Sequence, residues 1–258
     1  MENASVNPPL VTLSIVSHGD SQKIKQLLTS LHQYEHADEF QIIITDNLGN
    51  EFLEAEDLKW YALQIVHNKE PLGFACNHNQ AFQLATGRYF CVLNPDVIFE
   101  QKIFYSLIQL LKNNHADIVA PLVVDTDATP QDSFRSFPTP YEIIQRRLPA
   151  YHFNPPPIDS SGLTEPDWIA GIFMFMRSET YRVLNGFDEK YRLYFEDVDF
   201  CARAQLAGLK ILVDTNIRIQ HDAHHASRKN LIYLFWHIQS AFRFFTSPVY
   251  KKIKQKSK

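Results

Sequence analysis

Three carboxylates directly after an aromatic stretch are the first candidates for chemistry in this chain. Glu196, Asp197 and Asp199 follow residues 191–195, whose sequence is YRLYF. Burial raises the pKa of a carboxyl group and neighbouring cations lower it, so carboxylates among aromatic side chains can be tuned as proton acceptors. Acidic residues also favour the first turn of a helix, where they meet the positive end of its dipole. This window alone leaves both interpretations open.

Composition limits the class of protein that can carry this chemistry. The chain has 258 residues, of which 45% are hydrophobic, and can bury a sizeable core. A net charge of -4 argues against a nucleic-acid partner, because neutralising phosphates requires a basic face. Three scattered cysteines are too few for a disulfide framework or a zinc site. We expect one α/β domain over residues 1–228 and a C-terminal segment over residues 229–258.

Targeting signals are not evident in the sequence. The first ten residues, MENASVNPPL, have neither the basic nor the apolar region of a signal peptide. No uninterrupted apolar run reaches the eighteen residues that suggest a membrane-spanning helix. Together with the low cysteine content, these features predict a cytoplasmic protein.

Hydrophobic patterning predicts strands that alternate with helices. Short apolar runs typical of buried strands occur at residues 10–17, 40–45, 63–66, 88–93 and 210–213. An amphipathic stripe after the first run predicts a helix with Asp20 or Ser21 as its N-cap. Residues 75–85 predict a second helix, closed by Gly87. Such alternation is typical of βαβ crossovers and a mostly parallel sheet.

Polar side chains stand where the predicted strands end. Ligands of open α/β sheets bind beyond the carboxyl ends of the strands. The residues at those ends are Ser17 and His18, Asp46, Asn68 and Asp96. Loops are polar in any protein, but this coincidence at four ends favours a binding site there.

Two other features bear on the class of function. A nicotinamide-dependent oxidoreductase would need a G-x-G-x-x-G turn after the first strand, and this chain has SHGDS at 17–21 instead. Residues 125–167 are rich in Pro, Asp, Ser and Thr and predict a long surface excursion. That excursion can form a lip over an acceptor site or be a variable loop without substrate contact.

Motifs in order along residues 10–245 resemble those of family 2 glycosyltransferases, whose fold is GT-A, a Rossmann-like α/β domain. These motifs are TDN at 45–47, LGF at 72–74, NHN at 77–79, LNPD at 93–96, GFDE at 186–189 and YFEDVD at 194–199. Each is weak alone, and their order and spacing carry the resemblance. Within the family, the chain is similar to bacterial rhamnosyltransferases that extend a lipid-linked GlcNAc in O-antigen or related polysaccharide assembly.

The resemblance implies an inverting sugar transfer from a nucleotide diphosphate. It assigns donor binding to Ser17, His18, Asp46, Asn68, Gly73, Asn77, Asn94, Asp96, Arg228 and Lys229. Asp46 would accept a hydrogen bond from the nucleobase. Arg228 and Lys229 would clamp the diphosphate, although a solvated basic turn fits them equally well.

A divalent cation, Mg²⁺ or Mn²⁺, is the cofactor that the resemblance implies. Such an ion neutralises a leaving diphosphate, and Asp96 and His221 stand at the family's ligand positions. His224 or His225 could replace His221, and Asp96 could instead cap the turn after Pro95. The chain has Asn-Pro-Asp at 94–96 where the family more often has Asp-x-Asp.

The acceptor side of the reaction needs one base within reach of the attacking hydroxyl. Asp197 matches the family's base position, and Glu196 is assigned to orient it or to contact the acceptor. Trp168 is also assigned to acceptor binding. By resemblance the donor is dTDP-L-rhamnose and the acceptor a lipid-linked, GlcNAc-type saccharide. A UDP-hexose donor, or a non-catalytic protein that binds nucleotide sugars, remains the alternative.

The C-terminal segment combines apolar and basic residues. A wide helical stripe contains Leu231, Leu234, Phe235, Ile238, Phe242 and Phe245. It is followed by a basic tail with Lys251, Lys252, Lys254, Lys256 and Lys258. We expect weak, peripheral binding to the cytoplasmic face of the inner membrane. The competing interpretation is a helix that packs on the catalytic domain and ends in a solvated tail.

Overall fold

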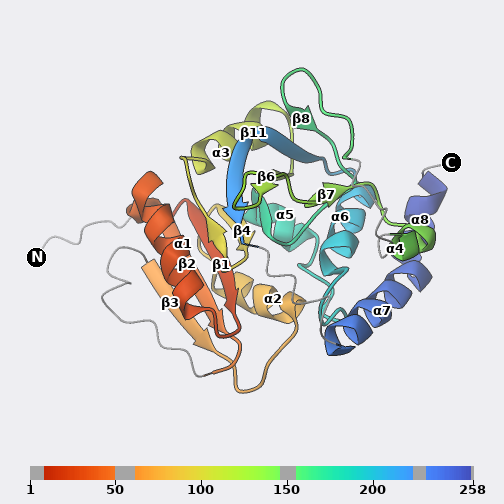
Figure 1. Ribbon diagram of the computed structural model, residues 1–258, viewed down its shortest axis with the longest axis horizontal. Coiled ribbons are helices and arrows are strands. Elements are labelled where there is room, and N and C mark those ends of the chain that lie inside the picture. The colour runs from red at the N-terminus through yellow and green to blue at the C-terminus, as the bar shows by residue number, and fades with distance from the viewer. Residues whose placement is uncertain (1–8, 50–61, 146–154, 223–230, 257–258) are drawn as a thin grey trace, which may run out of the picture.

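A nine-stranded sheet with helices on both faces forms the centre of the molecule (Figure 1). The computed structural model describes residues 9–49, 62–145, 155–222 and 231–256. This is the expected α/β architecture, with a sheet that is mostly parallel.

The elements follow the predicted alternation, with additions in the second half of the chain. The strands are β1 Val11–Ser17, β2 Phe40–Asp46, β3 Ala62–His67, β4 Tyr89–Leu93, β5 Val97–Ile98, β6 Ile118–Val124, β7 Phe134–Arg135, β8 Leu163–Thr164, β9 Trp168–Ile169, β10 Phe173–Arg177 and β11 Ile211–His221. The helices are α1 Ser21–Tyr34, α2 Phe74–Leu84, α3 Phe104–Asn113, α4 Pro140–Gln145, α5 Ser178–Val183, α6 Glu196–Leu206, α7 Leu231–Thr246 and α8 Pro248–Lys256.

Strand order brings the predicted polar ends to one edge. The order is β3-β2-β1-β4-β10-β6-β11-β5, with β8 beside β11 and a separate β7-β9 pair. The first four of these strands are parallel, and Ser17 lies opposite Asp46, which lies opposite His67. The ends of β1, β2 and β3 are therefore level with one another, as the sequence predicts.

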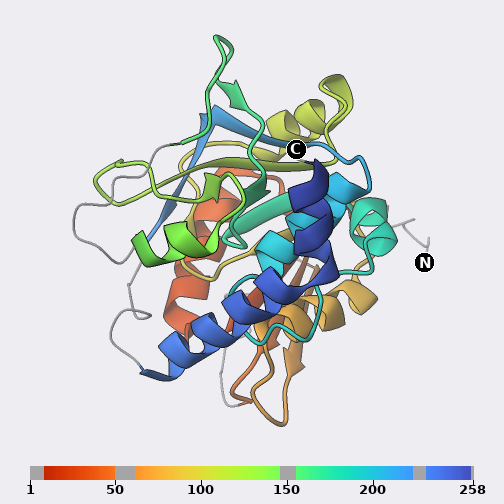
Figure 2. The same ribbon diagram turned by 90° about the vertical axis from the view of Figure 1, so that its right-hand side faces the viewer.

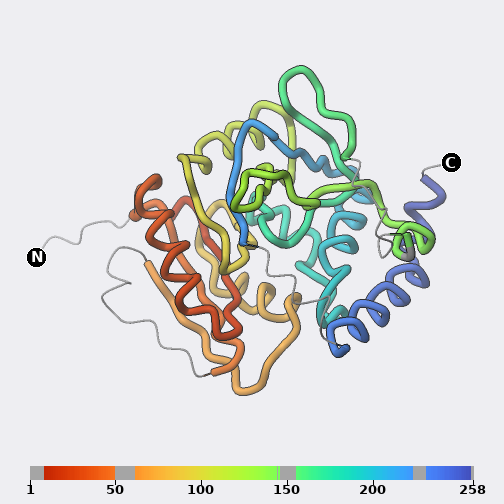
Figure 3. Tube along the Cα trace, in the orientation of Figure 1, coloured from red at the N-terminus to blue at the C-terminus, as the bar shows by residue number. Residues whose placement is uncertain are grey.

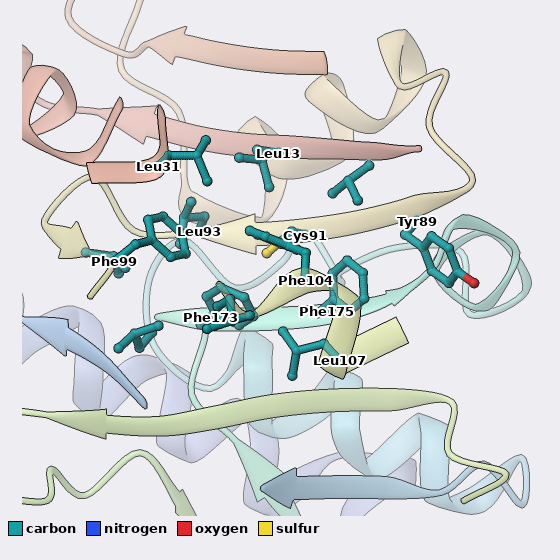
Figure 4. Packing of buried hydrophobic residues seen from close by; sticks show 14 of the residues in the cluster. Leu13, Leu31, Tyr89, Cys91, Leu93, Phe99, Phe104, Leu107, Phe173 and Phe175 are labelled. Carbon is teal, nitrogen blue, oxygen red and sulfur yellow. The ribbon is translucent and has the colours of Figure 1, made fainter. Parts of the chain in front are cut away.

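Alternating side chains of the central strands fill two cores, one on each face of the sheet. In β10, Phe173 and Phe175 face the side covered by α1 and α3, where they pack with residues of β1 and β4 (Figure 4). Met174 and Met176 face the opposite side, covered by α2, α5 and α6. Burying a side chain of this size stabilises the fold by roughly 1.5–3 kcal/mol, so both faces contribute to stability.

Three features differ from the sequence-based expectation. The patterns above assign no element to α3, β6 or β10, and β10 lies antiparallel between β4 and β6. Strand β11 continues well past the predicted 210–213, as far as His221. Gly87 does not cap α2, which ends at Leu84 with Ala85 as its C-cap; an added Cβ at Gly87 would lie 2.5 Å from the backbone N of Thr12. Gly87 is therefore needed for close approach between the start of β4 and β1.

The predicted start of α1 is right in position but not in its capping contact. Asp20 is the N-cap residue, yet its side chain makes no capping hydrogen bond to the helix. Its carboxylate instead accepts a hydrogen bond from the backbone N–H of His18 and lies 3.2 Å from Lys23 Nζ. The acidic side chain is thus part of the loop that follows β1.

The C-terminal segment is two helices, of which α8 packs against α6 and α7 packs against α8 and residues 193–195. Helices α7 and α8 lie in front of the rest of the chain in Figure 2, and the tube in Figure 3 shows the turn between them. Ala241, Phe244 and Ile253 are buried in the core on the α6 side. The lysines up to Lys256 therefore lie on a packed helix and not on a loose tail, while Lys258 is outside the described residues. Within the described ranges, no helix is long and apolar enough to cross a bilayer.

Candidate active site

A cleft of about 520 Å³ lies where the carboxyl ends of β1 and β4 face α7. Its polar and aromatic lining residues are His18, Asp20, Lys23, Phe74, His78, Asn94, Asp96, Arg192, Tyr233 and Trp236. Of the residues predicted to bind the donor, His18, Asn94 and Asp96 thus reach the cleft. The cleft lies at the edge of the sheet at which the strand order predicts a ligand site.

Asp96 and His221 are brought together by strand register. Because His221 of β11 pairs with Val97 of β5, its Nε2 atom lies 3.1 Å from Asp96 Oδ1. The amide of Gln131 holds the other side of the imidazole: His221 Nδ1 lies 2.9 Å from Gln131 Oε1, and Gln131 Nε2 donates to the His221 carbonyl. This arrangement turns an Nδ1–H toward Gln131 and leaves the Nε2 lone pair facing the carboxylate.

A lone pair opposite a carboxylate oxygen is stable only with a proton or a cation between them. Asp96 Oδ1 is buried and accepts no hydrogen bond from any described residue, and Asn94 Nδ2 lies 3.4 Å from His221 Nε2. In the part of the chain that the structure describes, no group of three or more His, Cys, Asp and Glu residues could hold a metal. Asp96 and His221 therefore fit an ion that takes its remaining ligands from water and substrate phosphates, as Mg²⁺ does.

Lys23 adds a positive charge beside this pair, and the sequence analysis did not identify it. Its Nζ atom lies 3.2 Å from Asp20 Oδ1 and 3.7 Å from Asp96 Oδ2, on the first turns of α1. The side chain is about one-third exposed and lines the cleft. A signal was available, since Lys23 lies close behind the end of the first strand, at the edge where ligands bind.

Asp197, the predicted base, lies half-buried at the start of α6. Its Oδ2 atom accepts a hydrogen bond from Gly171 N–H at 3.1 Å, and its Oδ1 atom accepts one from Val198 N–H at 2.8 Å. The neighbouring Glu196 is buried, and its Oε2 atom has no hydrogen-bond partner among the described residues. Neither carboxylate is among the residues that line the cleft.

The adjacent carboxyl groups both have a raised pKa. Burial and the Asp197 carboxylate raise the pKa of Glu196 well above its ordinary value. Burial also raises the pKa of Asp197, to about 6, against the opposing effect of the hydrogen bonds from Gly171 and Val198. Asp197 is therefore ionised near neutral pH, and the pKa of Glu196 is shifted upward by the additional effect of the Asp197 charge, which makes Asp197 the better candidate for the proton acceptor.

The third carboxylate of the cluster has a structural role. Asp199 lies 2.7 Å from Arg203 Nε, one turn further along α6. Arg203 also donates to the carbonyl oxygens of Leu184 and Gly186, in the turn that precedes the aromatic stretch. All three carboxylates stand in the first turn of α6, as the helix-start interpretation predicts, while the assignment of Asp197 as a proton acceptor stays a prediction.

One short segment connects Asn94 to Asp197. Asn94 N–H donates to the carbonyl of Ile172 at 2.9 Å, while the preceding Gly171 donates to Asp197. An added Cβ at Gly171 would lie 2.9 Å from the ring of Phe74, a residue of the cleft wall. Asp197, the predicted base, is therefore hydrogen-bonded to a segment that also binds Asn94 and lies against Phe74 of the cleft wall.

The backbone before the base is unusual. Tyr194 and Phe195 have φ values of 68° and 67°, in the left-handed region that non-glycine residues rarely adopt. Phe195 is buried and its ring lies 5.5 Å from that of His237 and 5.6 Å from that of Phe244, both on α7. Packing against α7 thus stabilises a strained segment next to the proposed base.

Several predicted donor residues lie behind the cleft wall. Asn68 is buried and donates to the side-chain oxygens of Asn47 and Asn77, and Asn47 binds both backbone polar groups of Leu72. An added Cβ at Gly73 would lie 2.6 Å from the carbonyl oxygen of Arg192. Asn68 and Asn77 therefore hold the loop after β3 through their side-chain hydrogen bonds, and Gly73 lets this loop approach the backbone of Arg192 closely.

Two further donor assignments also fall on turn residues. Ser17 is fully buried, and its hydroxyl accepts a hydrogen bond from Asp20 N–H. Asp46 is 1% exposed, and its carboxylate accepts from the N–H groups of Leu48 and Gly49 and lies 2.8 Å from His67 Nδ1. Neither residue lines the cleft. Arg228, Lys229, His224 and His225 lie outside the described residues.

Trp168 does not reach the cleft in this structure. Its ring is buried, its indole N–H donates to the Ser136 carbonyl, and the guanidinium of Arg135 lies 5.7 Å from the ring. The aromatic residues that do line the cleft on the α7 side are Tyr233 and Trp236, which the sequence analysis placed only in an apolar stripe.

His78 is a polar residue of the cleft that was noted only as part of a motif. It is buried, and its Nδ1 atom lies 2.7 Å from Ser14 Oγ. Burial lowers its pKa to about 3, so the imidazole is neutral. Its Nε2 atom has no hydrogen-bond partner among the described residues, which leaves one polar atom for a ligand.

The fold and this cleft define a class of α/β transferases, and comparison with known proteins gives the family. Residues 12–182 match the family model described as "Glycosyl transferase family 2". Rhamnosyltransferase WbbL of Escherichia coli K12 is 30% identical over 246 residues, which cover 91% of this chain and 92% of the relative. The chain belongs to glycosyl transferase family 2 and is a glycosyltransferase.

A second relative is also a rhamnosyltransferase, and two solved structures share the fold. The N-acetylglucosaminyl-diphospho-decaprenol L-rhamnosyltransferase of Mycobacterium tuberculosis is 33% identical over 78 residues, 30% of this chain and 25% of the relative. GalNAc-T7, with UDP, GalNAc and Mn²⁺, has a TM-score of 0.61 at 15% identity, over 84% of this chain and 44% of that one. A mannosyltransferase of Pyrobaculum calidifontis, with GDP-Man and Mn²⁺, also has a TM-score of 0.61. It is 16% identical, and the match covers 95% of this chain and 68% of that one. These likenesses confirm the GT-A fold.

The two adjacent carboxyl groups predict opposite outcomes for neutral substitutions. Asp197→Asn removes the ionised acceptor and should lower kcat by about 10² to 10⁴. Glu196→Gln puts a neutral amide in place of the buried carboxyl group with the raised pKa and should keep most of the activity. In the wild type, kcat/KM should fall about tenfold per pH unit below pH 6, because Asp197 becomes protonated there. Initial rates of both variants and the wild-type pH profile check this, and loss of activity only in Glu196→Gln would assign the base to Glu196.

Lys23 should bind nucleoside diphosphate even without a metal. Losing a charge-assisted contact of about 1.5 kcal/mol or more should weaken dTDP or UDP binding about tenfold in Lys23→Met when a chelator is present. Calorimetric titration measures this, and Lys25→Met, on the exposed side of α1, is the matched control. If Lys23→Met binds as tightly as the wild type with and without Mn²⁺, the lysine only neutralises Asp20 and Asp96.

Proposed function

We propose that this enzyme transfers L-rhamnose from dTDP-L-rhamnose to a lipid-linked, GlcNAc-type acceptor at the cytoplasmic face of the inner membrane, with inversion at the anomeric carbon. The observation that carries the proposal is the arrangement at the cleft: Asp96 lines it with His221 Nε2 3.1 Å away, and the segment 171–172 is hydrogen-bonded to both Asn94 and Asp197. The names of the two rhamnosyltransferase relatives support the choice of sugar.

The chemistry needs a base on one side of the sugar and positive charge on the other. Asp197 takes the proton of the acceptor hydroxyl as its oxygen forms a bond to C1 of the sugar, and the C1–O bond to the nucleotide diphosphate breaks. A Mg²⁺ or Mn²⁺ ion bound by Asp96 and His221 would supply charge for the leaving diphosphate. Lys23 adds a further positive charge on that side, and Mn²⁺ in the structures of two fold relatives is consistent with such an ion.

The donor and acceptor can be tested with purified protein. In the presence of Mn²⁺ or Mg²⁺, dTDP-L-rhamnose and a short-chain GlcNAc-diphospho-lipid analogue should give a product heavier by one deoxyhexose, with inverted anomeric configuration. Mass spectrometry and NMR of the product check both points. Turnover only with a UDP-hexose would overturn the donor assignment. Tight nucleotide-sugar binding without any transfer would favour the non-catalytic alternative.

The outer side of α7 supports a peripheral membrane location. Leu231, Phe235 and Phe242 are 81%, 62% and 70% exposed, and Ile238 lies on the same helical face at i, i+4, i+7 and i+11. Helix α8 continues from this face with exposed lysines Lys251, Lys252, Lys254 and Lys256. An exposed apolar face on one helix and exposed lysines on the next are the two kinds of group that bind an anionic bilayer surface. We therefore treat residues 229–258 as the membrane-binding part of the chain.

This face should bind anionic vesicles in a salt-sensitive way. Each lysine near such a surface contributes on the order of 1 kcal/mol, so binding should weaken at high salt. Phe235→Ser combined with Phe242→Ser should abolish flotation with phosphatidylglycerol vesicles, whereas Tyr105→Ser, an exposed aromatic on α3, should not. Substitution is preferable to truncation because Ile253 of α8 is buried in the core. A wild-type protein that remains unbound at low salt would contradict the membrane assignment.

A further inference from the structure

We propose that the inner side of α7, together with Arg192, is the subsite for the acceptor, with Trp236 and Tyr233 against the acceptor's sugar ring and Arg192 paired with the adjoining phosphate. The inference deepens the proposed function and rests on its acceptor class, a diphosphate-linked saccharide. It replaces Trp168, whose buried ring contacts Arg135, as the aromatic residue for acceptor binding.

The three side chains form one continuous wall of the cleft. Tyr233 and Trp236 stand three residues apart on α7, with ring centroids 5.3 Å apart and planes at 83°. The guanidinium of Arg192 lies 4.9 Å from the centroid of the Trp236 ring. All three residues line the cleft that also contains Asp96 and Lys23. The wall therefore combines aromatic faces with a positive charge.

The position of this wall distinguishes the acceptor from the donor. Lys23, Asp96 and His221 place the donor's diphosphate beside the ends of β1 and β11. Helix α7 is instead attached to the segment that leads into the base: Ser240 donates to the Leu193 carbonyl at 2.8 Å, and His237 contacts Tyr194 and Phe195. A saccharide against α7 therefore lies on the base side of the cleft, where the attacking hydroxyl has to be.

The wall also has the chemical groups that such a ligand needs. The C–H face of a sugar ring packs on aromatic rings, and the indole N–H and phenol O–H can bind hydroxyl or amide groups at its edge. Among the described residues, no carboxylate lies within ion-pair distance of Arg192, and neither the Trp236 N–H nor the Tyr233 hydroxyl has a hydrogen-bond partner. Arginine pairs with phosphate through two parallel hydrogen bonds, so Arg192 suits the diphosphate of the acceptor.

The two sides of α7 would serve the two ends of one substrate. The inner side carries Tyr233 and Trp236, and the outer side carries the exposed Phe235 and Ile238. A helix with its side chains is about 10–12 Å across, so the sugar subsite would lie within that distance of the membrane-binding face. A lipid-linked sugar could then remain anchored in the bilayer while its hydroxyl reaches the base.

Kinetics with a soluble, short-chain GlcNAc-diphospho-lipid analogue test the subsite. Trp236→Ala should raise the KM for this acceptor about tenfold, whereas the KM for the donor and the Kd for dTDP stay within about twofold. Trp236→Phe should restore most of the affinity, because it keeps an aromatic face. Arg192→Ala should raise the acceptor KM, and Arg192→Lys should recover it only in part, because lysine lacks the bidentate geometry. Gln239→Ala, at an exposed position of α7, is the matched control.

A direct binding measurement separates failure of this subsite from failure of the proposed function. The same analogue is titrated into wild type and Trp236→Ala by calorimetry, with dTDP bound and no donor sugar. If the wild type transfers rhamnose but Trp236→Ala binds the analogue with unchanged affinity, the subsite is wrong and the function stands. If the wild type neither binds nor glycosylates the analogue, the proposed acceptor class is wrong and the subsite is rejected with it.

Discussion

The backbone of residues 171–172 is the constraint on which the active-site geometry depends. Because β10 enters the sheet antiparallel to β4, Phe173 lies opposite Leu93, and the residues before β10 meet the residues after β4. Ile172 accepts a hydrogen bond from Asn94, and Gly171 donates one to Asp197. A displacement of this segment would change the distance between Asp96 and Asp197, the proposed cation ligand and the proposed base. A methyl group at Gly171 would meet the Phe74 ring, so only glycine fits there without adjustment.

Helix α7 connects this geometry to the surface of the molecule. Its buried residues pack on Phe195, which has left-handed backbone geometry immediately before the two carboxylates. Strained residues of this kind cost on the order of 1–3 kcal/mol each and persist where the surrounding packing holds them. The aromatic contacts of Phe195 with α7 supply that packing. The same helix lines the cleft and presents an apolar outer face, so binding at either side can affect the segment next to the base.

The sequence predicts the first half of the fold well and the assembly of the site only in part. Strands β1 to β4 are evident from periodicity, and the level strand ends follow from parallel pairing. Strand β10 is different, because an apolar run such as 173–177 shows neither its place in the sheet nor its direction. Its antiparallel insertion joins Asp96 to Asp197, which are about one hundred residues apart. Gln131 and Arg192 belong to no motif and become evident only from contacts in space, whereas Lys23 could have been found from its place close behind the first strand.

Location of the divalent cation tests the central claim most directly. Crystals of the wild-type protein with dTDP and Mn²⁺ should show anomalous scattering from manganese within about 2.0–2.3 Å of both Asp96 Oδ1 and His221 Nε2, the range expected for oxygen and nitrogen ligands. Gln131→Leu should weaken this signal without moving it, because the imidazole loses its orienting amide. Manganese bound away from Asp96, or a nucleotide complex with no manganese beside the diphosphate, would contradict the account.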